Sequence, residues 1–177
     1  TLLLDAVNFC FWPSPDFRVE HQGKRYGEDD GYPALAVALK RAFEEGMPLW
    51  DAQRLRDLTE AEFRHILRGE GEIALFDRRL ANARDIGATL LGKYGGDCRV
   101  LLESAKGDAP ALAAALASDF ASYADFRTYR GERFPVLKRA QICVSDLVGA
   151  FGGKDLGALG RAWRLTSPPA RVEGGRA

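Results

Sequence analysis

The segment ALFDRRLANARDIGATLLGKYGG, from Ala74 to Gly96, decides the fold class of this chain. Its apolar side chains recur every three or four positions, which is the spacing of a helix that buries one face. Gly95 and Gly96 follow this run, as is typical at the C-terminal end of a helix. The pattern predicts a helix over about 74–94, whose inward-facing residues are Leu75, Leu80, Ala83, Ile86, Leu90 and Leu91.

Two further helices are expected on the N-terminal side of this segment. Pro33 suits the first helical position of an element that ends at Gly46. Thr59 and Glu62 have the spacing of a capping box, in which each residue satisfies a free amide of the other's backbone. The helix that follows them should end at Gly69.

The C-terminal side shows the same helical period twice. Asp108 and Pro110 begin an alanine-rich helix that should reach about Tyr123. Pro135 is expected to open a last helix, which Gly152 and Gly153 end. The inward-facing residues predicted for this last helix are Val136, Leu137, Ala140, Cys143, Val144, Leu147 and Phe151.

One β-hairpin is expected near the N-terminus. Two short alternating runs between Phe17 and Tyr26 flank Gln22 and Gly23, which can form a tight turn. Together, the helices and this hairpin predict a single, mainly α domain. The length of 177 residues is usual for one domain.

The composition limits the partners that the chain can have. Lys and Arg number 25, as do Asp and Glu, so a broad positive surface for duplex nucleic acid is not expected. No apolar run reaches membrane-spanning length, and the opening Thr-Leu-Leu-Leu lacks the basic start of a signal peptide. Three cysteines and two histidines show no metal-ligand spacing. We expect a cytoplasmic monomer without a metal or organic cofactor.

The stretch LDAVNFCFWP, from Leu4 to Pro13, concentrates aromatic rings beside polar groups. Three rings occur within four positions, next to Asn8 and Asp5. Such a group could hold a flat heterocycle between rings and contact its polar edge. It could equally form an aromatic corner of a hydrophobic core, so the stretch alone leaves both interpretations open.

The stretch KRAQICVSD, from Lys138 to Asp146, combines charges of both signs on one predicted helix. Lys138, Gln141 and Ser145 share one face, and Arg139 and Asp146 share a neighbouring face. Two cations near a helix start could hold one phosphate, because the first-turn amides also favour anions. The alternative is a polar stripe that faces water.

Four blocks of sequence together resemble one known family. They are DAVNFCFWP (5–13), GYPALAVALKRAFEEGMPL (31–49), LRGEGEIALFDRRLANARDIGATLLGKYGG (67–96) and FPVLKRAQICVSDLVGAFGG (134–153). In this order they resemble the queuosine salvage family, the queuosine 5′-phosphate N-glycosylase/hydrolases. The likeness runs through most of 5–166.

The resemblance implies a fold, a reaction and roles for particular residues. The fold would be helical and similar to helix-hairpin-helix DNA glycosylases, and the reaction would cleave the N-glycosidic bond of queuosine 5′-phosphate. That cleavage frees the 7-deazaguanine base queuine for tRNA modification and leaves ribose 5-phosphate. One or two of the three rings would stack on the base, polar groups would contact its edge, and a helix would hold the phosphate and ribose. The implied base-binding residues are Asp5, Asn8, Phe9, Phe11 and Trp12, and the implied phosphate- and ribose-binding residues are Lys138, Arg139 and Gln141.

Such a reaction needs a carboxylate, and the sequence departs from the family pattern at the position where that carboxylate is expected. The resemblance implies an Asp in a D-Y-R-V-P-like segment after Leu-Thr, but Leu165-Thr166 is followed by Ser167-Pro168-Pro169-Ala170-Arg171-Val172-Glu173. Asp146 is therefore the catalytic residue that we expect, with Glu173 as the other candidate. We expect 1–166 to form the queuosine-salvage-like domain, incomplete at both ends, and 167–177 an irregular tail. A nucleotide-binding module without turnover and a helical protein-interaction domain remain as alternatives.

Overall fold

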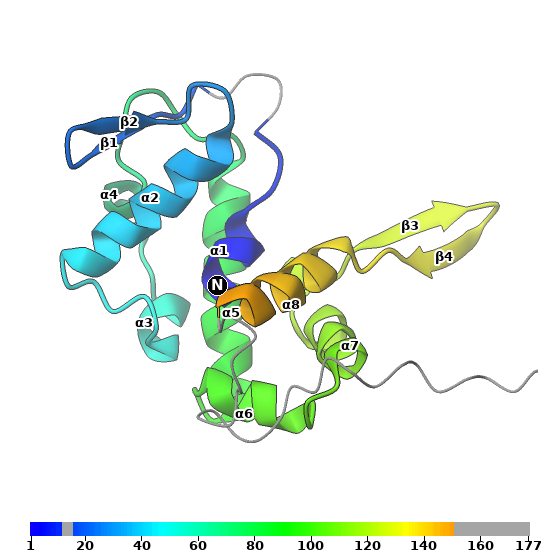
Figure 1. Cartoon of the computed structure of the whole chain (residues 1–177). Helices are drawn as coiled ribbons and strands as arrows, with labels where there is room; N and C mark the ends of the chain where they lie inside the picture. The colour runs from blue at the N-terminus through cyan, green and yellow to red at the C-terminus, as the bar shows by residue number, and fades with distance from the viewer. Residues whose placement is uncertain (12–15, 151–177) are drawn as a thin grey trace, which may run out of the picture.

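Helix α5 (Phe76–Tyr94) is the longest helix in the computed structural model, which describes residues 1–11 and 16–150. Helix α1 (Leu2–Val7) lies against α5, and α8 (Lys138–Ala150) packs on α1 and on α7 (Ala109–Asp119) (Figure 1). These contacts bring the N-terminal segment beside the last described helix. The positions of α1 and α8 therefore decide where the two predicted halves of the site meet.

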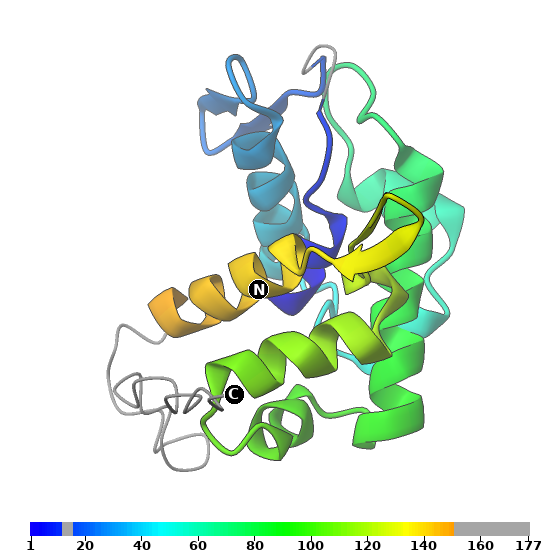
Figure 2. The same ribbon diagram turned by 90° about the vertical axis from the view of Figure 1, so that its right-hand side faces the viewer.

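The other elements surround this centre. A hairpin of β1 (Val19–His21) and β2 (Lys24–Tyr26) packs on α2 (Gly31–Glu44), which also contacts α4 (Glu60–Ile66). Helix α3 (Ala52–Arg56) packs on α5, and α6 (Cys98–Ser104) contacts both α5 and α7 (Figure 2). A 3₁₀ turn over Ala121–Tyr123 leads to a second hairpin, of β3 (Phe126–Tyr129) and β4 (Glu132–Pro135).

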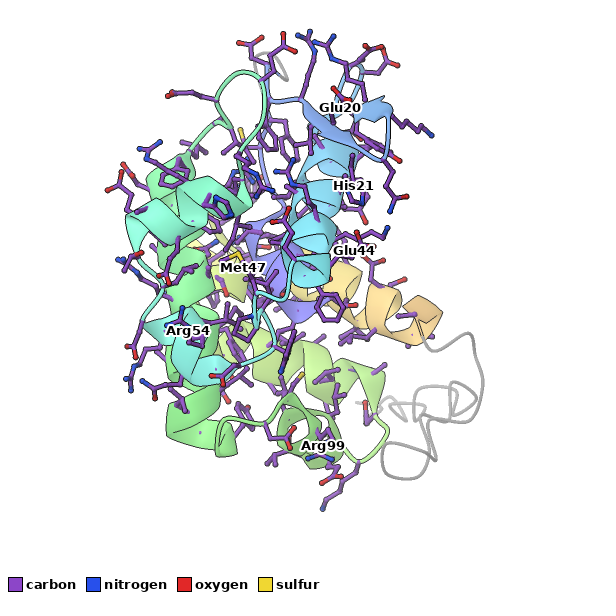
Figure 3. The ribbon with its side chains drawn as sticks, turned by 90° about the vertical axis from the view of Figure 1, so that its left-hand side faces the viewer. Glu20, His21, Glu44, Met47, Arg54 and Arg99 are labelled. Atoms are coloured by element: carbon purple, nitrogen blue, oxygen red, sulfur yellow. The ribbon has the colours of Figure 1, made fainter. Side chains whose placement is uncertain are left out.

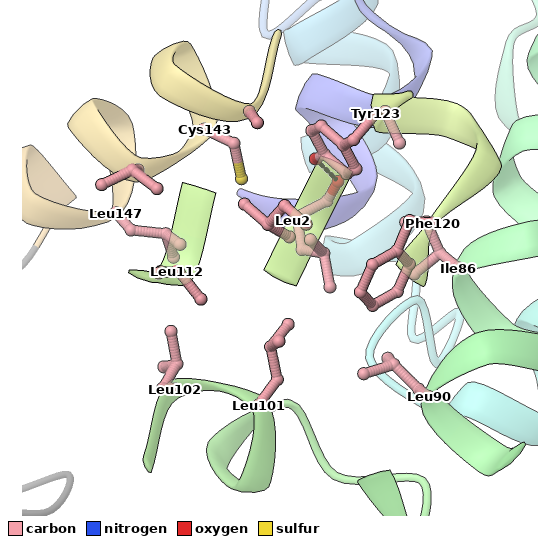
Figure 4. Packing of buried hydrophobic residues seen from close by; sticks show 14 of the residues in the cluster. Leu2, Ile86, Leu90, Leu101, Leu102, Leu112, Phe120, Tyr123, Cys143 and Leu147 are labelled. Atoms are coloured by element: carbon pink, nitrogen blue, oxygen red, sulfur yellow. Dashed lines mark hydrogen bonds between the residues drawn. The ribbon is translucent and has the colours of Figure 1, made fainter. Parts of the chain in front are cut away.

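Two hydrophobic clusters hold these elements together. The first lies beneath the β1–β2 hairpin and includes Phe17, Leu35, Phe63 and Ile66. The second joins α3, α6, α7 and α8, and Figure 4 shows Leu101, Leu112, Phe120, Cys143 and Leu147 in it. Helices α1 and α5 contribute to both clusters. Val7 of α1 and Leu80 of α5 lie in the first cluster, and Leu2 of α1 and Ile86 of α5 lie in the second. Burial of α1 in both clusters fixes the start of the chain in the middle of the fold.

Several sequence predictions are confirmed. The first hairpin pairs Val19 with Tyr26 and His21 with Lys24 around the expected turn. Thr59 caps α4 through both bonds of the predicted capping box. Helix α5 ends at Tyr94, before a left-handed Gly95. The fold is mainly helical, as predicted.

The first hairpin contacts α2 through polar side chains as well as by packing. The Nε2 atom of His21 lies 2.9 Å from the Oε2 atom of Glu44, and Figure 3 shows both side chains on their two elements. Glu44 also pairs with Lys40 one turn earlier in the helix, at 2.9 Å. The His21–Glu44 contact holds the hairpin against the end of α2.

Two proline assignments are wrong. Helix α2 begins at Gly31 with Asp30 as its N-cap, so Pro33 is its third residue. Pro135 does not open α8 but ends β4, where it pairs with Phe126. Leu137 then has a left-handed backbone (φ +55°), which prevents a helix from beginning before Lys138. Val136, predicted to face inward, is accordingly exposed.

The prediction of a single hairpin is also wrong. The segment 126–135 forms a second one around Arg130 and Gly131, both with positive φ. The short helices α1, α3 and α6 lie outside the predicted helical segments, and α7 ends at Asp119 instead of continuing to Tyr123. Phe151, Trp12 and the predicted tail lie outside the described residues.

Two glycines of α5 allow a matched test of its packing. A Cβ atom on Gly87 would lie 2.3 Å from the Arg56 nitrogen and 2.4 Å from the Ala52 oxygen, both backbone atoms of α3. A Cβ atom on Gly92 would meet nothing within 4 Å. We expect Gly87→Ala to lower the free energy of unfolding by about 1–3 kcal/mol through overpacking. Gly92→Ala should raise it by up to about 1 kcal/mol. Urea unfolding compares the two variants, and a gain in both would contradict the close α3–α5 contact.

Candidate functional site

Helix α1 is anchored by side chains from two distant parts of the chain. The Nδ2 atom of Asn82 donates to the carbonyl of Ala6 at 2.7 Å. The buried hydroxyl of Tyr123 donates to the carbonyl of Leu2 at 2.7 Å, the bond drawn in Figure 4. The carbonyl of Ala6 lies in the last turn of α1, where carbonyls have no partner within the helix itself. The aromatic block that follows α1 therefore starts from a fixed position.

Arg79 of α5 holds the chain that leaves α1. Its side chain is fully buried, and its Nη1 atom donates to the carbonyl of Val7. Its Nη2 atom donates to the carbonyls of Phe9 and Cys10, at 2.6 and 2.9 Å. Burial lowers the pKa of this guanidinium to about 10, which still leaves it charged at neutral pH. One buried cation thus shapes the backbone of the predicted base-binding block.

The rings of the aromatic block pack on the same guanidinium. The Cζ atom of Arg79 lies 4.5 Å from the centre of the Phe9 ring and 4.7 Å from that of the Phe11 ring. Both rings are half-buried. A Cβ atom on Gly31 would lie 2.2 Å from the Phe11 ring, so Phe11 also packs closely on the start of α2. These contacts hold both rings in defined positions, as either a stacking platform or a core corner requires.

The start of α8 is fixed by Asp125. Its carboxylate accepts hydrogen bonds from the backbone nitrogen and the Nε atom of Arg139, both at 3.0 Å. Burial opposes ionisation of Asp125, but the bonds from Arg139 outweigh it and lower the pKa of Asp125. The Arg139 guanidinium lies 5.6 Å from the centre of the Phe9 ring. This contact joins the aromatic block to α8, although about 130 residues separate them in the sequence.

Two carboxyl groups form a second link between α1 and α8. Asp5 is only 3% exposed, and burial together with the nearby charge of Asp146 raises the pKa of Asp5 to about 6. Burial and the charges of Asp146 and Asp5 also raise the pKa of Tyr32, at the start of α2. Three elements therefore contribute ionisable groups to one region.

The predicted site residues occupy different environments within this region. Asn8, Phe9 and Phe11 are half-buried, and Trp12 lies outside the described residues. On α8, Arg139 is half-buried and engaged by Asp125, while three predicted residues are exposed: Lys138, Gln141 and Asp146. The structure brings Phe9 to Arg139 and Asp5 to Asp146.

Three residues of this region were not predicted from the sequence. Arg79 lies on the same face of α5 as Ala83 and Ile86, and a charged residue in such an apolar stripe is a signal that could have revealed it. Asp125 and Tyr32 lie in segments whose neighbours in space depend on the tertiary fold. No local pattern of theirs indicates the contact with α8.

A cavity lies elsewhere in the described part of the chain. A pocket of about 840 Å³ opens between α4 and the start of α5, and none of the predicted site residues line it. Its lining includes Arg64, Arg68, Glu72 and Asp77, so charges of both signs surround it. Among residues 1–11 and 16–150, no cluster of His, Cys, Asp or Glu could hold a metal ion. No helix of this part is long and apolar enough to span a membrane.

Comparisons with known proteins agree on one family. A family model described as "Queuosine salvage protein" matches residues 1–167. A protein of Sphaerobacter thermophilus named queuosine 5′-phosphate N-glycosylase/hydrolase is 46% identical over 166 residues, 94% of this chain and 50% of that protein. Proteins of the same name from Bos taurus and Dictyostelium discoideum are 34% and 31% identical, over 88% and 93% of this chain and 46% and 47% of their own lengths. The chain thus spans about half the length of the curated relatives it matches. It belongs to the queuosine salvage protein family.

Proposed function

We propose that this chain carries the site that hydrolyses the N-glycosidic bond of queuosine 5′-phosphate and releases queuine. The observation that carries this proposal is the contact between the aromatic block and α8, where the Arg139 guanidinium lies 5.6 Å from the Phe9 ring. The names of the relatives supply the reaction and the substrate. The resemblance to helix-hairpin-helix glycosylases remains a prediction about the fold.

The base would lie on the aromatic block. Phe9, Phe11 and Trp12 provide faces for stacking, and Asn8 provides a donor and an acceptor for the polar edge of the base. Asp5, predicted together with Asn8, has both carboxyl oxygens buried in the described structure. The support for this role is that Arg79 fixes the backbone and both described rings. A platform held in this way loses little conformational entropy when the base binds.

The ribose and phosphate would lie along α8. Asp125 already engages Arg139, so Lys138 is the cation that we assign to the 5′-phosphate. Gln141, one turn further along the helix, would contact the ribose. Asp146 would stabilise the positive charge that develops on the ribose as the bond breaks, and would orient the attacking water.

A comparison of two substrates tests the phosphate assignment. We expect Lys138→Ala to lower kcat/KM for queuosine 5′-phosphate by about 10- to 100-fold, the loss of one charge-assisted hydrogen bond. The value for unphosphorylated queuosine should change little. Lys24→Ala, an exposed lysine of β2, is the control and should leave both values unchanged. An equal loss for both substrates in Lys138→Ala would remove Lys138 from the phosphate site.

The remaining expectations belong to the same proposal. We propose a cytoplasmic monomer that needs no metal or organic cofactor and does not bind duplex nucleic acid. The equal numbers of basic and acidic residues support the last point. A binding module without turnover is the second candidate, because no Asp follows Leu165-Thr166 where the resemblance implies one. Tight binding of queuosine 5′-phosphate without release of queuine would favour that module.

A further inference from the structure

Helices α1 and α8 bring two aspartates from opposite ends of the described chain together. Leu2 and Ala6 of α1 share a hydrophobic cluster with Cys143 and Leu147 of α8. Asp5 lies within one turn of Leu2, and Asp146 lies one turn after Cys143. Figure 4 shows Leu2, Cys143 and Leu147 in this packed region. The two carboxyl groups therefore sit at the edge of a rigid contact between helices.

Asp5 has no strong hydrogen-bond donor among the described residues that would stabilise its charge. Its side chain is 3% exposed, and no N–H or O–H group of the described residues donates to either of its buried oxygens. The thiol of Cys143, a weak donor, lies beside it and only partly offsets the effect of burial. A buried carboxylate without partners is unfavourable, and the usual remedy is a bound proton.

Among the ionisable groups around Asp5, Asp146 is the one that can accept a hydrogen bond from that proton. Burial raises the pKa of both the Cys143 thiol and the Tyr123 hydroxyl, so both are protonated at neutral pH. The Tyr123 hydroxyl already donates to Leu2. The exposed Asp146 is the neighbour that can carry the negative charge in water. The ionisable groups that act on Asp5 or respond to its charge, from four parts of the fold, are the amino group of Thr1, Tyr32, Tyr123, Cys143 and Asp146.

We propose that Asp5 and Asp146 hold a single proton between them, with Asp5 as the positioning residue that orients the carboxylate of Asp146. Below about pH 6 the buried Asp5 keeps the proton and donates one hydrogen bond to Asp146. The pair then carries one negative charge in place of two. Two carboxylates in contact cannot both ionise without strong repulsion, and burial decides which of them keeps the proton.

This arrangement gives the buried Asp5 a role in the reaction that needs no contact with the base, and that role rests on the proposed function. A carboxylate held by one hydrogen bond keeps a fixed direction toward the ribose, whereas an exposed aspartate alone would sample several rotamers. At low pH a second proton on the pair removes its negative charge. When the pH rises and Asp5 loses its proton, repulsion separates the two groups. Turnover should therefore decline on both sides of an optimum.

Carbon-13 NMR titration of the aspartate carboxyl groups tests the shared proton without any substrate. The signal of Asp5 is assigned by its absence in Asp5→Asn. We expect it to titrate near pH 6 in the unaltered chain and at lower pH in Asp146→Asn, which removes the neighbouring charge but lies on the surface. Asp125 serves as the internal control, because its partner Arg139 is unchanged. The same midpoint for Asp5 in both proteins, or a midpoint near pH 4 in the unaltered chain, would overturn the pair.

Turnover of queuosine 5′-phosphate by two Asp5 variants then tests the positioning role. Asp5→Asn keeps a donor toward Asp146 and should be more active than Asp5→Leu, which has none. It should also lose the decline in rate at high pH. Equal activity of the two variants would mean that Asp5 only fills space and would overturn the positioning role. If the unaltered chain releases no queuine while the NMR titration behaves as expected, the proposed function fails and the proton pair stands.

Discussion

Replacement of Arg79 by alanine should lower the free energy of unfolding by about 3–5 kcal/mol, a large effect for one residue. The guanidinium is fully buried and donates to the carbonyls of Val7, Ala74, Phe9 and Cys10. Each buried carbonyl that loses its donor destabilises the fold by about 1–3 kcal/mol. The contacts with the Phe9 and Phe11 rings are lost as well.

The neighbouring arginine provides a matched control for this prediction. Arg78 precedes Arg79 in α5 but is exposed, so Arg78→Ala should change the free energy of unfolding by no more than about 0.5 kcal/mol. Urea unfolding followed by circular dichroism measures both variants. A loss below about 1 kcal/mol in Arg79→Ala would show that the aromatic block does not depend on this side chain.

Replacement of Asp146 by asparagine should reduce kcat for queuosine 5′-phosphate by about 100-fold or more. The amide has nearly the shape of the carboxylate but no charge, so it cannot stabilise positive charge on the ribose. Because the base and phosphate contacts remain, KM should change much less. Asp146 is exposed on α8, so the variant should fold as the unaltered chain does.

An exposed aspartate outside the site controls for the loss of one negative charge. Asp77 lies in the first turn of α5 and is exposed. Asp77→Asn should leave kcat unchanged. If Asp146→Asn is as active as Asp77→Asn, then Asp146 is a surface charge, and the catalytic carboxylate must be sought elsewhere.

Local patterns in the sequence predict those parts of the fold that local interactions form. The hairpin at Gln22-Gly23 depends on its own turn, the start of α4 on the reciprocal bonds of Thr59 and Glu62, and α5 on its apolar stripe. The prediction that Pro135 opens α8 is wrong because proline suits the end of a strand as well as the start of a helix. The left-handed Leu137 that follows it has no sequence signature.

The site depends on contacts that no local pattern contains. The aromatic block indicates a platform, but its geometry comes from Arg79, about 70 residues away. Helix α1 is too short to be stable alone and forms because both clusters bury its side chains. The pairing of Asp5 with Asp146 exists only once α1 packs on α8.

Single-turnover reaction of the chain with queuosine 5′-phosphate tests whether these residues form a hydrolytic site. The chain is held in excess over the substrate, so that each substrate molecule is bound and reacts at most once. Binding of the nucleotide and cleavage of its bond can then be measured separately, even if turnover is slow. We expect queuine and ribose 5-phosphate to form in equal amounts, and Asp146→Asn to bind the nucleotide but leave it intact. A chain that binds queuosine 5′-phosphate and returns it unchanged, or does not bind it, would contradict the claim that these residues form a hydrolytic site.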